Sequence, residues 1–174
     1  MRTGELAAVW RKLEQELRRL NGESVDQMLL PPASIGEISE IEATAGTLLP
    51  TDYRESLLVH SGTSYWAWLW DAVALNTPAQ VVEEWEQLRL LAEHPRNRFV
   101  GLQAEPGVRS DMFHPHWIPV AADNGIPICL DLAPAKGGCV GQVILVDWED
   151  ERTKIIAPNF LGFLLSGLAK LQVQ

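Results

Sequence analysis

Asp123 and Asp131 are the two carboxylates whose type and spacing best fit acid–base chemistry. Paired carboxylates can act as general acid and general base when a fold brings them together. Asp123 stands directly before Asn124-Gly125, which is typical of a tight hairpin because both central residues must tolerate a positive φ. Asp131 is placed to cap the exit of a strand. Turn and cap chemistry is therefore the favoured interpretation, and a hydrolase that uses Asp123, Asp131 or His114 remains an alternative.

The histidines and cysteines lack the spacing of a metal or nucleophile site. His114 and His116 flank one proline, and no nearby Cys or carboxylate completes the three or four ligands that zinc needs. Cys129 and Cys139 form no CxxC motif and fit small buried thiols better. The glycine-rich stretch 135–141 is not a GxxxxGK[ST] phosphate loop, and no G-x-S-x-G elbow is present. We expect no metal, no cofactor and no catalytic residue.

Tryptophan is the more informative residue type, since the chain has 7 in 174 residues. Trp66, Trp68 and Trp70 alternate with other residues, which predicts a strand over 64–70 with three indoles on one face. A helix above that face would make it core, whereas exposed indoles form the anchors that protein interfaces favour. The candidate partner-binding residues are Trp66, Trp68, Trp70, Asp71, Asp123, Asn124 and Asp131.

The formal charge of -9 and the pI near 4.9 argue against a nucleic-acid partner, because phosphate binding needs clustered Lys and Arg. An acidic surface keeps a protein soluble, and it also steers association with a basic partner. The longest uncharged stretch, 155–169, is short for a membrane span and contains Pro158. No apolar signal segment follows the first residues, and two cysteines are too few for a disulfide scaffold. These features predict a cytoplasmic protein without a membrane partner, and none of them favours a particular oligomeric state.

Hydrophobic periodicity and capping residues predict the elements that would position these side chains. Leu6, Trp10, Leu13, Leu17 and Leu20 form one stripe of an N-terminal helix. Capping boxes at Ser34 and Thr77 begin two further helices. Helices are predicted over 3–20, 34–46, 51–60, 77–94 and 158–171, and further strands over 117–122, 126–132, 140–148 and 153–157. Helices at both ends and in the middle, around a mostly antiparallel sheet, predict an α+β fold, and the length fits one domain over 1–174.

Several phrases occur in an order that resembles the SUKH superfamily, whose namesake is the Smi/Knr-type fungal cell-wall regulator. The resemblance covers about residues 34–168. Its phrases are LPTDYRESLL at 49–58 with HSG at 60–62, WIPVAADNG at 117–125, CLDL at 129–132, GQV at 141–143 and APNFLGFL at 157–164. It implies a central, mostly antiparallel sheet flanked by helices, and no enzymatic activity.

The resemblance also implies a protein partner. Many bacterial members look like immunity proteins that bind and neutralise a toxin, often a nuclease, whereas fungal members act as regulatory scaffolds. A chain of charge -9 complements the basic cleft of a nuclease, so neutralisation of a basic toxin is the first hypothesis. A housekeeping regulatory scaffold of the Smi/Knr type is the alternative.

Overall fold

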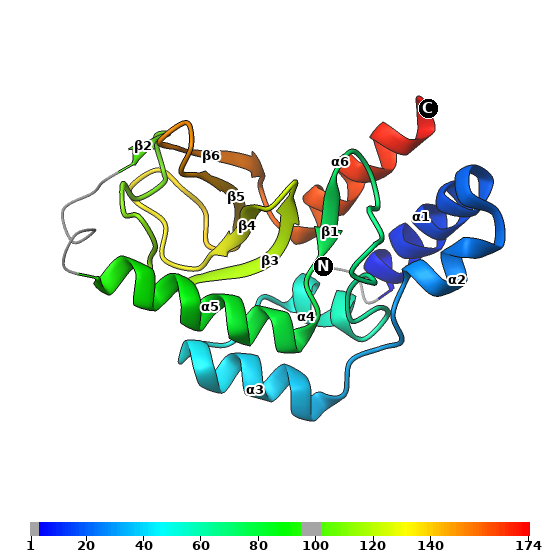
Figure 1. The fold of residues 1–174 in the computed structure, drawn as a ribbon, viewed down its shortest axis with the longest axis horizontal. Coiled ribbons are helices and arrows are strands. Elements are labelled where there is room, and N and C mark those ends of the chain that lie inside the picture. Colours follow the sequence, from blue (N-terminus) through cyan, green and yellow to red (C-terminus); the bar gives the residue numbers. More distant parts are fainter. Residues whose placement is uncertain (1–3, 95–101) are drawn as a thin grey trace.

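A six-stranded sheet forms the centre of the fold within residues 4–94 and 102–174, the part of the chain that the computed structural model describes (Figure 1). The strand order is β1-β3-β4-β5-β6-β2, and every pair is antiparallel except β2 with β6. The strands are β1 (Val73–Leu75), β2 (Gln103–Ala104), β3 (Trp117–Asp123), β4 (Ile126–Asp131), β5 (Gln142–Asp147) and β6 (Arg152–Ala157).

Helices from the start, middle and end of the chain flank this sheet, so the α+β prediction is confirmed. They are α1 (Glu5–Asn21), α2 (Val25–Met28), α3 (Ile35–Ala45), α4 (Thr51–Leu57), α5 (Pro78–Glu93) and α6 (Phe160–Gln172). The capping boxes at Ser34 and Thr77 are both formed. The predicted start of the first helix at Thr3 lies outside the described residues. None of the described helices combines the length and the apolar character needed to cross a bilayer.

The Asn-Gly turn sets the register of the central hairpin. Asn124 has φ 49° and Gly125 has φ 84°, the left-handed conformation that a two-residue hairpin of this twist requires. Asp123 therefore pairs with Ile126, and Trp117 pairs with Asp131 at the other end of the hairpin. The predicted turn is confirmed, and it places the two candidate carboxylates at opposite ends of β3 and β4.

The sheet is buried on both faces, which explains why β4 carries an almost continuous apolar run. Ile128 and Leu130 belong to the larger core, to which α1, α3, α4 and α6 contribute. Cys129, which points the other way, belongs to a smaller core that includes Leu88 of α5. In Figure 1, α5 and α3 lie together along one side, and α1 and α6 lie together at the far end.

The predicted strand over 64–70 is wrong, because this segment is a loop. Burial does alternate along the segment, but the smaller residues Ala67 and Leu69 are buried while Trp66 and Trp68 are exposed. Trp70 is buried as well, so the three indoles do not share one face. The first strand is the short β1 that follows. Two smaller predictions are also corrected: α4 ends at Leu57, before the predicted end at His60, and α2 follows α1 where no helix was predicted.

Candidate functional site

The Trp loop, residues 64–72, is fixed at both ends by backbone hydrogen bonds. The N–H of Ser64 donates to the carbonyl oxygen of Met28 at 2.9 Å, which joins the start of the loop to α2. The N–H of Leu69 donates to the carbonyl oxygen of Val73 at 2.8 Å, which closes the far end. Between them, Ala67 and Leu69 are fully buried in the larger core. The backbone of the loop is therefore anchored on both sides of its outward-facing side chains.

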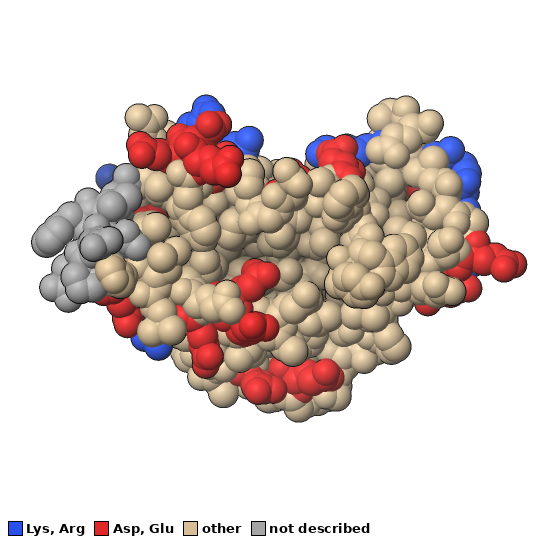
Figure 2. All heavy atoms as spheres, viewed as in Figure 1, with Lys and Arg blue, Asp and Glu red and all other residues tan. Residues whose placement is uncertain are grey.

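Three aromatic side chains of this loop face outward. Tyr65 is 93% exposed, Trp66 48% and Trp68 59%, values far from those of core aromatics. The two indoles border the Trp groove, an open depression of about 460 Å³. Figures 1 and 2 have the same viewpoint. The surface around the Trp loop, which lies beside β1 in Figure 1, is largely uncharged in Figure 2. The Trp groove is lined by Leu20, Asn21, Ser24, Met28, Trp66, Ala67, Trp68, Leu69, Trp70, Asp71, Leu171 and Gln174.

Trp70 and Asp71 lock the end of the Trp loop onto α6. The Trp70 ring meets Phe163 edge to face at 5.3 Å between centroids, and a Cβ added to Gly167 would lie 2.4 Å from the same indole. Asp71 adopts φ 49°, and its carboxylate accepts a hydrogen bond from Nζ of Lys170 at 2.5 Å. Trp70 thus packs as a core residue, whereas Asp71 stays at the rim of the groove.

The hairpin candidates separate into two groups. The N–H of Asn124 donates to the carbonyl oxygen of Ala72 at 3.2 Å, so the turn with Asp123 and Asn124 lies beside the end of the Trp loop. Asp131 lies five residues along β4 from the turn, a distance of about 16 Å at the usual rise per residue. Asp123 and Asp131 consequently do not form the carboxylate pair that acid–base catalysis would use.

Asp131 is fully buried and organises the loop that follows it. Its Oδ1 accepts from the N–H of Ala133 at 3.0 Å, which is the predicted strand-exit cap, and its Oδ2 accepts from Nε2 of Gln142 at 2.9 Å. The Oε1 of Gln142 accepts from the N–H of Cys139 at 3.0 Å. Burial raises the pKa of the Asp131 carboxyl, and these hydrogen bonds offset part of that rise. The arrangement is a structural network.

We expect Asp131→Asn to destabilise the fold although the two side chains have the same shape. Oε1 of Gln142 is occupied, so its Nε2 must face residue 131, where the amide of Asn would place a second donor. A buried donor left without an acceptor costs about 1–3 kcal/mol, which urea unfolding would measure. Asp123→Asn makes the same chemical change at the partly exposed turn and should cost less than about 0.5 kcal/mol. A more stable Asp131→Asn variant would show that the burial of the charge outweighs its hydrogen bonds.

The residues considered as metal ligands do not converge. Within 4–94 and 102–174, no group of three or more His, Cys, Asp or Glu side chains is placed to hold an ion. His114 accepts the backbone N–H of His116 at 3.1 Å through Nδ1, which uses one of its nitrogens locally. Cys129 is buried as predicted, whereas Cys139 is exposed, so the prediction of a buried thiol is wrong there.

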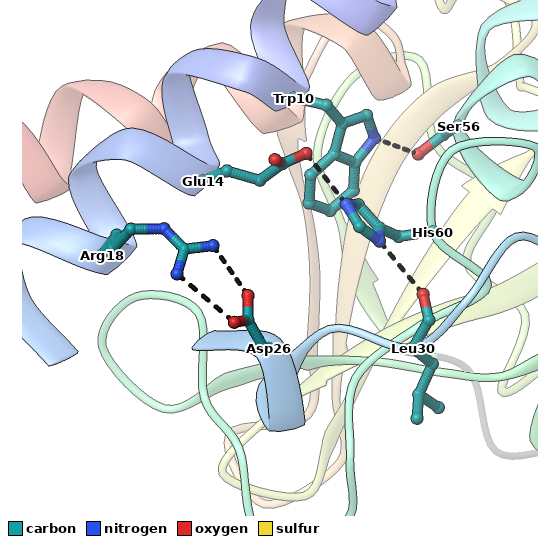
Figure 3. Close-up of polar contacts among 7 residues, drawn as sticks. All are labelled: Trp10, Glu14, Arg18, Asp26, Leu30, Ser56 and His60. Carbon is teal, nitrogen blue, oxygen red and sulfur yellow. Dashed lines mark hydrogen bonds and ion pairs between the residues drawn. The ribbon is translucent and has the colours of Figure 1, made fainter. Parts of the chain in front are cut away.

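Polar contacts that join α1 to α4 and to His60, which follows α4, were not predictable from the sequence (Figure 3). The indole N–H of Trp10 donates to Oγ of Ser56 at 2.9 Å, 46 residues away. His60 lies between Glu14 and Leu30, with Nε2 3.0 Å from Oε1 of Glu14 and Nδ1 3.0 Å from the carbonyl oxygen of Leu30. These contacts fix α1, whose last turn forms one wall of the Trp groove. The helical stripe that predicted burial of Trp10 was the only signal for them.

Comparison with known proteins shows one family. Residues 32–166 match the model of the SMI1 / KNR4 family (SUKH-1). A KNR4/SMI1 homolog of Yarrowia lipolytica is 26% identical over 210 aligned positions, which cover 91% of this chain and 29% of the relative. The cell wall biosynthesis/cell cycle regulator smi1 of Schizosaccharomyces pombe is 28% identical over 148 positions, covering 76% and 29%. A glucan synthesis regulatory protein of Neurospora crassa is 22% identical over 198 positions, covering 91% and 37%.

The chain spans about a third of the length of these relatives, between 29% and 37%. The family match nearly coincides with the predicted family-like segment 34–168 and contains α3, the Trp loop, the central hairpin and most of α6. It leaves out α1, α2 and residues 167–174, so the Trp groove is lined partly by the matched segment and partly by residues before and after it. Because the match covers most of the chain, this protein belongs to the SMI1/KNR4 family (SUKH-1).

Proposed function

We propose that this chain is a non-enzymatic protein-binding module that acts as a regulatory scaffold and binds its partner at the Trp loop and Trp groove. One observation carries the proposal: Trp66 and Trp68 are about half exposed on a loop whose residues Ala67, Leu69 and Trp70 are buried in the core. A contiguous exposed apolar surface marks interaction sites in soluble proteins. Tryptophan is also enriched among the residues that contribute most to binding energy.

The rigidity of the Trp loop supports a preformed binding surface. Binding costs entropy for each side chain and loop that must be ordered, and a loop that is already fixed avoids much of this cost. The Asp71–Lys170 ion pair and the buried Leu69 hold the loop without a partner. The separation of Asp123 from Asp131 supports the non-enzymatic part of the proposal, since the acid–base pair considered for a hydrolase is not assembled.

The names of the relatives favour regulation over toxin neutralisation. Two of the relatives described above are named as regulators, of cell wall biosynthesis and the cell cycle in one case and of glucan synthesis in the other. We therefore place the scaffold role first, in a reducing cytoplasm that suits the unpaired Cys129 and Cys139. Immunity against a basic toxin is the second candidate. It is favoured by the charge of -9 and by the acidic side chains that Figure 2 shows along α3 and α5.

The proposal is tested by capture of partners from the native cell extract with the wild-type chain and with the double variant Trp66→Ala/Trp68→Ala. We expect the double variant to bind the captured partner at least about 30-fold more weakly, because the loss of even one central tryptophan at an interface costs about 2 kcal/mol or more. The affinity for the purified partner would be measured by calorimetry. An endogenous partner would support the scaffold, and a basic toxin would support immunity.

Leu90→Ala provides the matched control. Leu90 is 59% exposed on α5, the same exposed fraction as Trp68, but it lies outside the Trp groove. Its loss should leave the affinity unchanged. Equal affinity of the wild-type chain and the double variant would remove the Trp loop from the binding surface.

A further inference from the structure

Two helices end at the Trp groove. Leu20 and Asn21 of α1 line it together with Leu171 and Gln174 at the end of α6. Figure 1 shows α1 and α6 running toward the same end of the molecule. The last carbonyl groups of a helix lack helical donors, and each helix carries about half a negative charge at its C-terminus. The groove therefore lies at two negative helix ends.

A cationic side chain of the protein itself already contacts one of these helix ends. A guanidinium nitrogen of Arg19 donates to the carbonyl oxygen of Leu171 at 2.9 Å, while its Nε pairs with Glu16 at 2.6 Å. Among the groove-lining residues of the described chain, the one charged side chain is the carboxylate of Asp71, which is paired with Nζ of Lys170 at the rim. The lining residues themselves thus supply acceptors and no cation, and the side chains of Lys170 and Arg19 contact two of them.

The exposed indoles add a second means of holding a cation. The face of a tryptophan ring attracts ammonium and guanidinium groups through its quadrupole, more strongly than the faces of tyrosine and phenylalanine. Such a pair exists within the described residues, where Cζ of Arg89 lies 5.8 Å from the centroid of the Trp85 ring. Trp66 and Trp68 have exposed rings with no cation stacked on them within the described residues.

We propose that the Trp groove binds a basic segment of the protein partner, in which Arg or Lys side chains stand next to apolar residues. The cations lie over the indoles of Trp66 and Trp68 and toward the carbonyl groups at the ends of α1 and α6. The apolar residues fill the groove beside Met28 and Leu171. The net charge of -9 attracts such a segment before contact. This inference rests on the proposed function and names the chemistry of the partner.

The test uses the full chain, uniformly labelled with ¹⁵N, and a seven-residue peptide of alternating Arg and Leu. At low salt we expect the peptide to shift the indole N–H signals of Trp66 and Trp68 and the backbone signals of Asn21 and Ser24. A peptide with citrulline in place of Arg has the same shape without the charge, and it should bind at least about 10-fold more weakly. High salt should reduce this difference, because screening weakens exposed charges.

Substitution of one indole separates the attraction of the ring from its apolar area. Trp68→Phe should retain part of the preference for Arg over citrulline, and Trp68→Leu should lose more of it. Equal affinities for the two peptides, or shifts confined to the backbone signals of α5, would overturn the inference. It would also be overturned if a β-glucan oligosaccharide shifted these indoles and the Arg peptide did not.

The two proposals fail in different ways. If the partner requires Trp66 and Trp68 but the groove does not distinguish Arg from citrulline, the binding surface stands and the basic segment is wrong. If the double variant captures the partner as well as the wild-type chain does, the proposed binding surface fails, and the inference about its partner fails with it.

Discussion

Trp70→Ala is expected to lower the free energy of unfolding by about 3–5 kcal/mol, the usual cost of removing a large aromatic side chain from a core. Trp70 is 4% exposed and packs between Phe163 and the backbone at Gly167. Nothing else in the Trp loop fills this space, so truncation leaves a cavity between the loop and α6. Urea unfolding followed by far-UV circular dichroism would measure the change.

Trp66→Ala and Trp68→Ala are the matched controls, because they remove the same side chain from the same loop. Both indoles are about half exposed, and each substitution should cost less than about 1 kcal/mol. Gly167→Ala changes the α6 side of the same contact. It should lower the free energy of unfolding by about 1–3 kcal/mol, since the added Cβ would overlap the Trp70 ring. An unchanged unfolding midpoint for Trp70→Ala would mean that the loop does not pack on α6 as described.

Features encoded by neighbouring residues were predictable from the sequence. Ser34 and Glu37 satisfy each other's backbone groups, so the four-residue segment 34–37 suffices to begin α3. Asn124-Gly125 adopts the positive φ angles that only such residues favour, and this fixed the register of the central hairpin. Helices and strands whose boundaries depend on such local chemistry were predicted within a few residues.

The Trp loop was mispredicted because its conformation depends on distant residues. Alternation of large side chains is typical of a strand, but a strand needs a hydrogen-bonded neighbour along its length. Here Ser64 bonds to Met28, and the chain then turns at Trp70 toward Val73. The inward places are filled by the smaller Ala67 and Leu69, a choice that only the packing partners reveal.

The grouping of some candidate residues was predictable from the sequence, whereas their role in binding stays a prediction. Trp66, Trp68 and Asp71 line one groove, although they lie on a loop and not on the predicted strand. Trp70 lines it too but packs mainly as core, and Asp131 lies in a buried network. The opposite wall of the groove comes from α1, α2 and the end of α6, and no pattern in the Trp loop indicates those neighbours.

Trp10→Ala is expected to lower the free energy of unfolding by about 3–5 kcal/mol, although α1 lies outside the segment that matches the family. Trp10 is 0% exposed, its N–H donates to Ser56, and its ring meets His60 edge to face at 4.9 Å. Because these contacts join α1 to α4 and to His60, which lies between α4 and the Trp loop, we expect the whole molecule to unfold in one shifted transition. Urea unfolding followed by circular dichroism and by indole fluorescence would show whether the two signals coincide.

Trp10→Phe separates the hydrogen bond from the packing. It retains most of the ring and loses the donor to Ser56, so it should cost about 1–2 kcal/mol, well below the alanine variant. A main transition that stays in place for Trp10→Ala, with faster hydrogen exchange confined to α1, would contradict a single cooperative unit. Leu20 and Asn21 at the end of α1 line the Trp groove, so loss of α1 packing removes one of its walls. Trp10→Ala should therefore weaken partner binding even though Trp66 and Trp68 are intact, whereas Trp10→Phe should not.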